Sequence, residues 1–163
     1  MKRSGFTLIE LLVVFIVIAI LAASMLLTMS GSEDSAQATA ILNDLRIMKS
    51  GAHLFVMSSD DFHPMAGTNY AELLGQYMDH GRIINDPVRY SFFVDIPNDM
   101  WWVGVRVTGT GSGKKVNGIL EGNASSFRTM RLYGSSDINT PPPDFTLTSA
   151  YKSAHMAVWT NVK

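Results

Sequence analysis

The chain opens with an unbroken apolar stretch and then changes to a periodic pattern. Residues 6–27 are almost all apolar, and Glu10 is the one charged side chain among them. Apolar residues then recur at alternating spacings of three and four, which is typical of an amphipathic helix. This row is Ala38, Ile41, Leu45, Met48, Ala52 and Phe55, and a second row lies beside it at Ala40, Ile47 and Leu54. The pattern predicts one helix over residues 6–58, about 80 Å long at 1.5 Å per residue.

The first half of this helix, residues 6–27, is long enough to be a transmembrane segment. The polar stretch around Ser30 and Gly31 is where the helix should leave the bilayer. Glycine lowers helix stability by about 1 kcal/mol relative to alanine, so local bending or melting is expected there. In the second half, one apolar row is expected to pack on the protein's own domain and the other to meet neighbouring chains. A homodimeric coiled coil is the alternative, but the row lasts under three heptads.

Beyond Ser58 the helical period ends. Asp60-Asp61-Phe62-His63-Pro64 stops the helix, because a proline disfavours helix at the residue before it. Asn69 and Glu72 have the spacing of a capping box for a short helix through about Met78. Strands rich in β-branched and aromatic residues are expected at 88–96, 100–108, 115–121, 126–133 and 155–162. Turns are expected at Asn98-Asp99 and at 109–113.

The predicted fold class is therefore α+β. One long N-terminal helix, transmembrane and then amphipathic, packs against a small antiparallel β-sheet of four or five strands. Residues 59–163 form the globular head, which is large enough for one modest core. Trp101 and Trp102 are expected to lie on opposite faces of a strand, one ring buried and the other partly exposed.

Glu10 needs an explanation in such a helix. An acidic residue in mid-bilayer costs roughly 2.5–3.5 kcal/mol, so a partner is expected for it. No cation lies within residues 6–27, and Lys2 and Arg3 lie at or beyond the membrane surface, so the partner is not expected to be local. Cleavage after Gly5 would create an α-amino group on Phe6, one helical turn before Glu10. That amine could reach Glu10 of its own chain or of a staggered neighbour, and only the second arrangement gives the charge a role in assembly.

The segment Lys2-Arg3-Ser4-Gly5, followed by Phe6-Thr7-Leu8-Ile9-Glu10, resembles the class III signal of type IV pilins and of the pseudopilins of type II secretion systems. The resemblance covers only the start of the chain. It implies that residues 1–5, with the basic Lys2 and Arg3, are a leader that a prepilin peptidase removes between Gly5 and Phe6. It also implies N-methylation of Phe6 and a type IV pilin-like fold. Finally, it implies that Glu10 pairs with the amino terminus of an adjacent subunit during filament assembly.

By this resemblance the chain is expected to be a structural subunit, not an enzyme, of a bacterial type IV pilus-like filament or a type II secretion pseudopilus. The implied partners are further copies in a helical filament, minor pilins or pseudopilins, the prepilin peptidase, an assembly platform protein and an ATPase. The implied location is the inner membrane, crossed once, before assembly, and a periplasmic pseudopilus or cell-surface filament afterwards. A surface pilus would serve adhesion, motility or DNA uptake.

Two features favour the pseudopilus slightly. Asp61-Phe62-His63-Pro64 is similar to a segment that follows the long helix in major pseudopilins. The chain also has no cysteine, whereas many Gram-negative major pilins close their C-terminal region with a disulfide. The loop region 134–154 is, by the same resemblance, the variable surface segment.

Charge and composition argue against nucleic-acid binding. The full chain holds 13 Lys and Arg against 14 Asp and Glu, and loss of Lys2 and Arg3 leaves 11 against 14, a net charge of −3. No basic stretch follows the leader, so no direct contact with nucleic acid is predicted. The lack of cysteine excludes disulfides and thiolate metal sites.

Other interpretations of the chain fit less well. An ordinary secretory signal has an apolar stretch of only about 7–15 residues. The stretch 109–115 fails as a P-loop, because Thr108 stands where glycine is required, Lys115 replaces the hydroxyl residue, and the loop is expected to join two strands. Asn123-Ala124-Ser125 matches a glycosylation acceptor, a short pattern that arises often by chance.

No catalytic or metal-binding set is recognised. The chain has no Gly-x-Ser-x-Gly motif, so a membrane-anchored enzyme or ligand-binding domain is the remote alternative. No cofactor or metal is predicted. Some pseudopilins hold calcium in a C-terminal loop, but no Asp-x-Asp run occurs near Asp137 or Asp144, so structural calcium is a minor alternative. A loose polar set could approach in loops: Asp60, Asp61, His63, Asp79, His80 and Asp86.

Overall fold

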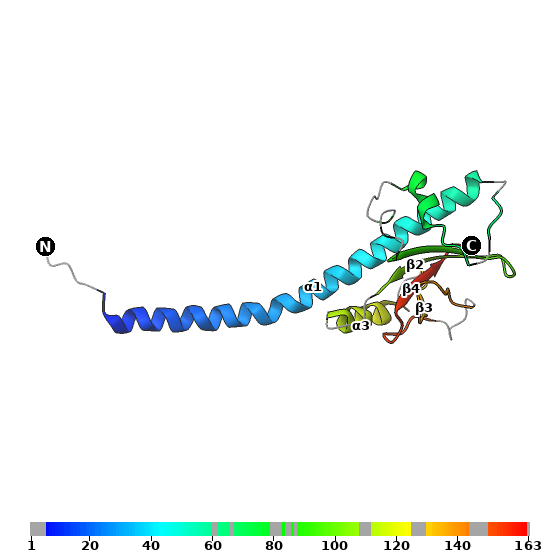
Figure 1. Ribbon diagram of the computed structural model, residues 1–163. Helices are drawn as coiled ribbons and strands as arrows, with labels where there is room; N and C mark the ends of the chain where they lie inside the picture. Colours follow the sequence, from blue (N-terminus) through cyan, green and yellow to red (C-terminus); the bar gives the residue numbers. More distant parts are fainter. Residues whose placement is uncertain are drawn as a thin grey trace.

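A long helix carries a small head at one end (Figure 1). The computed structural model describes residues 6–59, 62–65, 67–78, 83, 86, 88–107, 112–124, 130–143 and 150–162, with the backbone alone at 27–30 and 112–114. Helix α1 runs over Leu8–Ser58, 51 residues, and confirms the predicted long helix. Phe6 and Thr7 precede it rather than forming its first turn, and Thr7, the N-cap, is extended.

The melting predicted near Gly31 is wrong for this subunit. Helix α1 continues through Ser30 and Gly31, and Figure 1 shows it curving without a break. A Cβ added at Gly31 would meet no atom within 4 Å, so the glycine serves no close approach. Its cost of about 1 kcal/mol is small beside the hydrogen bonds of the helical turns on either side.

The head contains a four-stranded antiparallel sheet in the order β1-β2-β4-β3. The strands are β1 (Tyr90–Asp95), β2 (Met100–Arg106), β3 (Tyr133–Ser135) and β4 (Ala157–Asn161). Residues 96–99 form the predicted turn between β1 and β2, and Asp99 adopts a φ of 49° in it. The α+β architecture predicted from the sequence is therefore confirmed.

Two predicted strands are wrong. Residues 115–121 lie in helix α3 (Ser112–Ala124), which packs alongside α1. Val116, Asn117 and Leu120 are buried while Gly118 and Glu121 are exposed, a pattern that fits one face of a helix and not the alternation of a half-buried strand. The predicted strand 126–133 reduces to the short β3, which begins at Tyr133; residues 125–129 lie outside the described part of the chain.

The short helix after Asn69 is η1 (Ala71–Tyr77), a 3₁₀-helix. The predicted capping box is wrong, because Tyr70 occupies the N-cap position and makes no side-chain capping bond. The side-chain amide of Asn69 is directed instead to strand β1. Its oxygen also accepts a hydrogen bond from the Ala71 N–H, at the start of η1. Helix η1 lies against the last turns of α1, and Tyr77 Oη is 2.6 Å from Ser58 Oγ.

The core lies between the second half of α1 and one face of the sheet. The α1 row predicted to face the head is buried: Ala38, Ile41, Leu45, Met48, Ala52 and Phe55. It packs against Phe92, Val103 and Val158 of the sheet. In the second row, Leu54 remains 52% exposed. Ala40 and Ile47 of that row are half-buried, and Ile47 packs against the core, so only Leu54 follows the predicted division of the two rows between head and outer surface.

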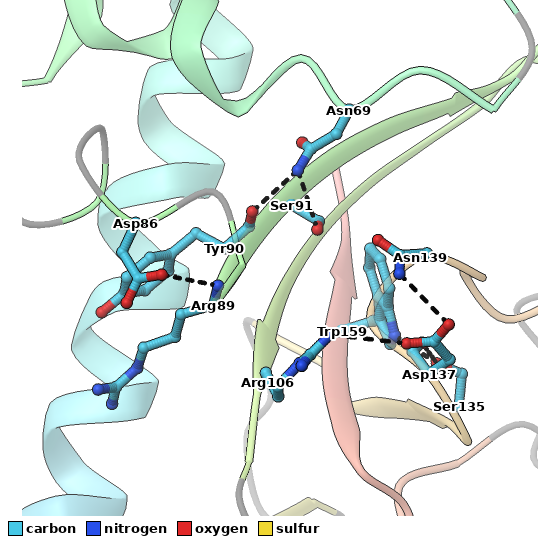
Figure 2. A network of polar contacts seen from close by, with 10 residues as sticks. All are labelled: Asn69, Asp86, Arg89, Tyr90, Ser91, Arg106, Ser135, Asp137, Asn139 and Trp159. Atoms are coloured by element: carbon cyan, nitrogen blue, oxygen red, sulfur yellow. Dashed lines mark hydrogen bonds and ion pairs between the residues drawn. The ribbon is translucent and has the colours of Figure 1, made fainter.

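The opposite face of the sheet carries a second apolar cluster. Trp102, Trp159 and Tyr133 meet there, with Ile138 of the following loop over them. The Trp159 indole N–H donates to Ser135 Oγ at 2.8 Å (Figure 2). Trp101 and Trp102 do lie on opposite faces, but both rings are buried, so the predicted partly exposed ring is wrong. A Cβ at Gly104 would lie 2.4 Å from the Trp159 ring, so this close approach requires glycine.

Candidate assembly site

The candidate site is the first turn of α1, which is closed by a capping box between Thr7 and Glu10. Thr7 has extended dihedral angles, φ −84° and ψ 150°, and its Oγ1 accepts from the Glu10 N–H at 3.4 Å. In return, Glu10 Oε2 accepts from the Thr7 N–H at 2.8 Å and from the Thr7 hydroxyl at 2.7 Å. The acidic side chain also lies in the first helical turn, where the helix dipole favours negative charge.

Glu10 therefore has local hydrogen-bond donors within the chain, whereas its predicted cationic partner stays a prediction. The first N–H groups of a helix have no intrahelical acceptor, so a carboxylate three residues after the N-cap can serve them. The Thr-x-x-Glu spacing is itself a sequence signal for this capping arrangement, and the sequence-based prediction did not include it. Phe6 precedes the helix, so its nitrogen does not lie one helical turn from Glu10.

Around this turn, the apolar half of α1 is uncovered. Every large apolar side chain among residues 6–26 is at least 48% exposed, and Phe6 is 81% exposed. By length and composition, α1 is able to cross a membrane. An apolar surface of this extent marks a contact with lipid or with other protein chains. The pilin-type signal motif at the start of the chain and this helix together indicate membrane anchoring.

The remaining predicted site residues are less informative. Lys2, Arg3 and Gly5 lie outside the described residues, so cleavage after Gly5 and methylation of Phe6 remain predictions. Of the loose polar set, Asp60, Asp61, Asp79 and His80 also lie outside them. His63 is exposed, and Asp86 Oδ1 accepts from the Arg89 N–H at 3.1 Å. Within the part that is described, no group of three or more His, Cys, Asp or Glu is placed to hold a metal ion.

Asp34 was not singled out from the sequence, although it precedes Ala38 by one turn on the buried row. It is only 4% exposed, and its Oδ2 lies 3.8 Å from Lys115 Nζ of α3. Among the α1 residues whose side chains are described, Asp34 is the first that is buried. The ion pair therefore joins α3 to α1 at the point where the helix enters the head.

Helix α3 also holds the turn before β4 through the two main-chain groups of a single residue, Ser153. Glu121 Oε2 accepts from the Ser153 N–H, and Asn117 Nδ2 donates to the Ser153 C=O, each at 3.0 Å. Next to these groups, His155 Nδ1 accepts from the Lys152 N–H at 2.9 Å. Burial and the nearby Lys152 lower the pKa of His155, which favours the neutral ring that this hydrogen bond requires. Burial, reinforced by Glu121, raises the pKa of Tyr151.

The model of one known family, the prokaryotic N-terminal methylation motif, matches residues 1–26. The chain carries the class III signal of type IV pilins and pseudopilins. The matched stretch contains the Thr7–Glu10 capping box and all but the end of the predicted transmembrane segment, 6–27. The motif supports a pilin-like or pseudopilin subunit with pilin-type assembly, which involves a prepilin peptidase and filament partners. Comparison with curated proteins and with solved structures gives no match.

Proposed function

We propose that this chain is a structural subunit of a type IV pilus-like filament or secretion pseudopilus, assembled from the inner membrane through the apolar halves of α1. The observation that carries the proposal is the methylation motif at the start of a helix whose first half the head leaves uncovered. Among the side chains that the structure describes, the head packs on α1 from Asp34 onward. A subunit of this shape can exchange lipid for other copies of itself around residues 6–27 without refolding its head.

Glu10 gains a second partner in this proposal. In the single subunit its carboxylate accepts two hydrogen bonds from Thr7. After cleavage between Gly5 and Phe6, the methylated amine of a neighbouring Phe6 supplies the positive charge that the sequence lacks nearby. A charge in an apolar core is tolerated when it is paired and its remaining lone pairs keep hydrogen bonds, and the Thr7 donors provide the latter. The pairing thus favours one axial register between neighbouring helices.

The secretion pseudopilus is the branch that we favour. The reasons are the absence of cysteine and the Asp61-Phe62-His63-Pro64 segment. In the structure, Phe62 of this segment packs edge-on against Phe55 at 4.8 Å and Tyr70 at 5.1 Å between ring centroids, so it anchors the end of α1 to the head. Genes for a secretin and a secretion ATPase beside this one would support the pseudopilus, whereas a retraction ATPase would support a surface pilus.

Replacement of Glu10 tests the proposal. Glu10→Ala should be processed normally, shown by a mature mass that lacks residues 1–5, and should remain in the membrane without forming filaments. Glu33→Ala is the matched control, because Glu33 is an exposed acid on the same helix beyond the apolar half, and it should assemble normally. A replacement of Gly5 should leave the full precursor mass. Normal filaments from Glu10→Ala would refute the pairing role.

A further inference from the structure

At the outer edge of β1, the main-chain groups of Tyr90 and Phe92 are engaged within the chain. Strand β1 is at one end of the sheet order, so among the described residues no strand pairs with its outer side. The Arg106 N–H donates to the Arg89 C=O, so the odd-numbered residues of this region direct their main-chain groups toward β2. Because the direction alternates along an antiparallel strand, Tyr90, Phe92 and Val94 direct theirs outward.

The four outward groups of Tyr90 and Phe92 have partners. The Asn69 side chain serves two of them: its Oδ1 accepts from the Phe92 N–H at 2.9 Å, and its Nδ2 donates to the Tyr90 C=O at 3.0 Å. The Tyr70 N–H donates to the Phe92 C=O at 2.8 Å, and the Asp86 C=O accepts from the Tyr90 N–H at 3.1 Å. Figure 2 shows the Asn69 amide against the strand, beside Tyr90 and Ser91. The amide takes the place that a peptide group of another strand would occupy, because it offers the same donor and acceptor.

The orientation of this amide is fixed by its other contacts. Its Oδ1 also accepts from the Ala71 N–H at 3.0 Å, and its Nδ2 also donates to Ser91 Oγ at 3.2 Å. Exchange of the oxygen and nitrogen positions would set a donor against two N–H groups. The amide is therefore held in the one orientation that fits the strand edge.

Strand β1 is the edge that most needs such protection. Its sequence, Tyr-Ser-Phe-Phe-Val-Asp, is apolar and aromatic with one charge at its end, which is the composition of a segment that pairs readily with other chains. The opposite edge, β3, has only three residues, and Tyr133 forms a further bridge to Ala150. Short length is itself a common protection of an edge strand.

We propose that Asn69 closes the β1 edge against strand-to-strand association between copies of this chain. Subunits then meet through α1 and not through their sheets, a consequence that rests on the proposed function. The closure itself does not depend on filament assembly, so it can be tested in a subunit that cannot assemble.

The test uses the full-length chain in detergent micelles and carries Glu10→Ala in every variant. Asn69→Ser removes both main-chain contacts to β1 and the contact to Ser91 Oγ, and it leaves a hydroxyl that can still accept from the Ala71 N–H. Asn69→Asp keeps the acceptor for the Phe92 N–H and adds a charge at the edge. The matched control is Asn98→Ser, which removes a side-chain bond from Asn98 Nδ2 to Asp95 Oδ2 in an exposed turn.

Hydrogen exchange at the Phe92 amide and light scattering against concentration are the two measurements. Asn69→Ser should exchange about tenfold faster at Phe92, the loss of one hydrogen bond, and should form oligomers with an intermolecular β band in the infrared. Asn69→Asp and Asn98→Ser should stay monomeric with slow exchange at Phe92.

The proposal is overturned if Asn69→Ser matches Asn98→Ser in both measurements. It is also overturned by faster exchange without association, because the opened edge would then not be a docking surface. Association without faster exchange would place the contact elsewhere and overturn it as well. None of these outcomes depends on whether the wild-type chain forms filaments.

Discussion

The hydroxyl of Thr7 lies 2.7 Å from the Glu10 carboxylate, the shorter of its two contacts with Thr7. This contact makes Thr7 the residue that orients Glu10 in the unassembled subunit. Without it, the carboxylate would keep only the Thr7 N–H, and the Glu10 N–H would lose its acceptor. A helix start that frays would also leave the Glu10 carboxylate less well positioned for the pairing that we propose.

We predict that Thr7→Val loosens the first turn of α1. Loss of an N-cap costs about 0.5–2 kcal/mol, so the Glu10 amide should exchange several-fold faster in micelles. Thr7→Ser retains the hydroxyl and should exchange at the wild-type rate. Equal rates in the valine and serine variants would show that the hydroxyl does not cap the helix.

The His155 ring predicts a pH dependence of head stability. Its pKa is lowered in the folded chain, whereas in the unfolded chain it takes its ordinary value of about 6.5. The unfolded chain therefore gains a proton first as pH falls, and stability present above about pH 6.5 is lost toward the folded pKa. Of the groups beside the ring, Lys152 lowers its pKa further and Glu121 opposes that shift.

A titration of the midpoint of thermal unfolding from about pH 7.5 to about pH 5.5 checks this dependence. The midpoint should decline in the wild type and decline less in His155→Asn, whose Oδ1 can accept from the Lys152 N–H without titrating. His53→Asn, a change at an exposed histidine of α1, should keep the wild-type slope. Equal slopes in the wild type and His155→Asn would rule out the histidine as the source.

Among the elements, α1 was the easiest to predict and α3 the hardest. The long apolar row from Ala38 to Phe55 predicted a helix and no other element, because its period matches a helix over many turns. In α3, Gly118 and Gly122 each weaken helix by about 1 kcal/mol, and β-branched Val116 suggested a strand. The three- and four-residue spacing of Val116, Ile119 and Leu120 was the signal for a helix. The low helix propensity of this segment is outweighed by the burial of Val116 and Leu120 in the core shared with α1.

The same contrast applies to the candidate site. The motif around Gly5, Phe6 and Glu10 was recognisable because its residues are adjacent in sequence, and the matched family model agrees with it. The role of Asn69 was not recognisable, since its partners at Tyr90 and Phe92 come next to it only when β1 folds back onto the loop. A side chain that bonds to distant main-chain groups leaves no local pattern.

The α1 interface predicts a sharp difference between two leucines of the same helix. Leu45 is fully buried against the sheet, whereas Leu54 is 52% exposed on the second row. Leu45→Ala should lower the free energy of unfolding of the head by about 2–5 kcal/mol, and Leu54→Ala by about 0.5 kcal/mol or less. Denaturant unfolding followed by tryptophan fluorescence measures both. Similar losses in the two variants would contradict the assignment of the two rows.

The whole molecule combines a head that has its own core with a helix whose apolar half is exposed. The head has its own core on both faces of the sheet, a closed β1 edge and an ion pair, Asp34–Lys115, where α1 enters it. The apolar half of α1 has no such cover, and the head does not fold back onto it. These two properties fit a subunit that is stable alone in the membrane and complete only beside other copies.

The central claim is that the apolar halves of α1 meet in the filament core with Glu10 paired across subunits. Electron cryo-microscopy of filaments sheared from cells that express the processed chain tests it most directly. We predict a core built from residues 6–27, with each Glu10 carboxylate within about 4 Å of the Phe6 nitrogen of a neighbour. A filament whose core excludes this half of α1, or in which Glu10 faces no amine, would contradict the claim.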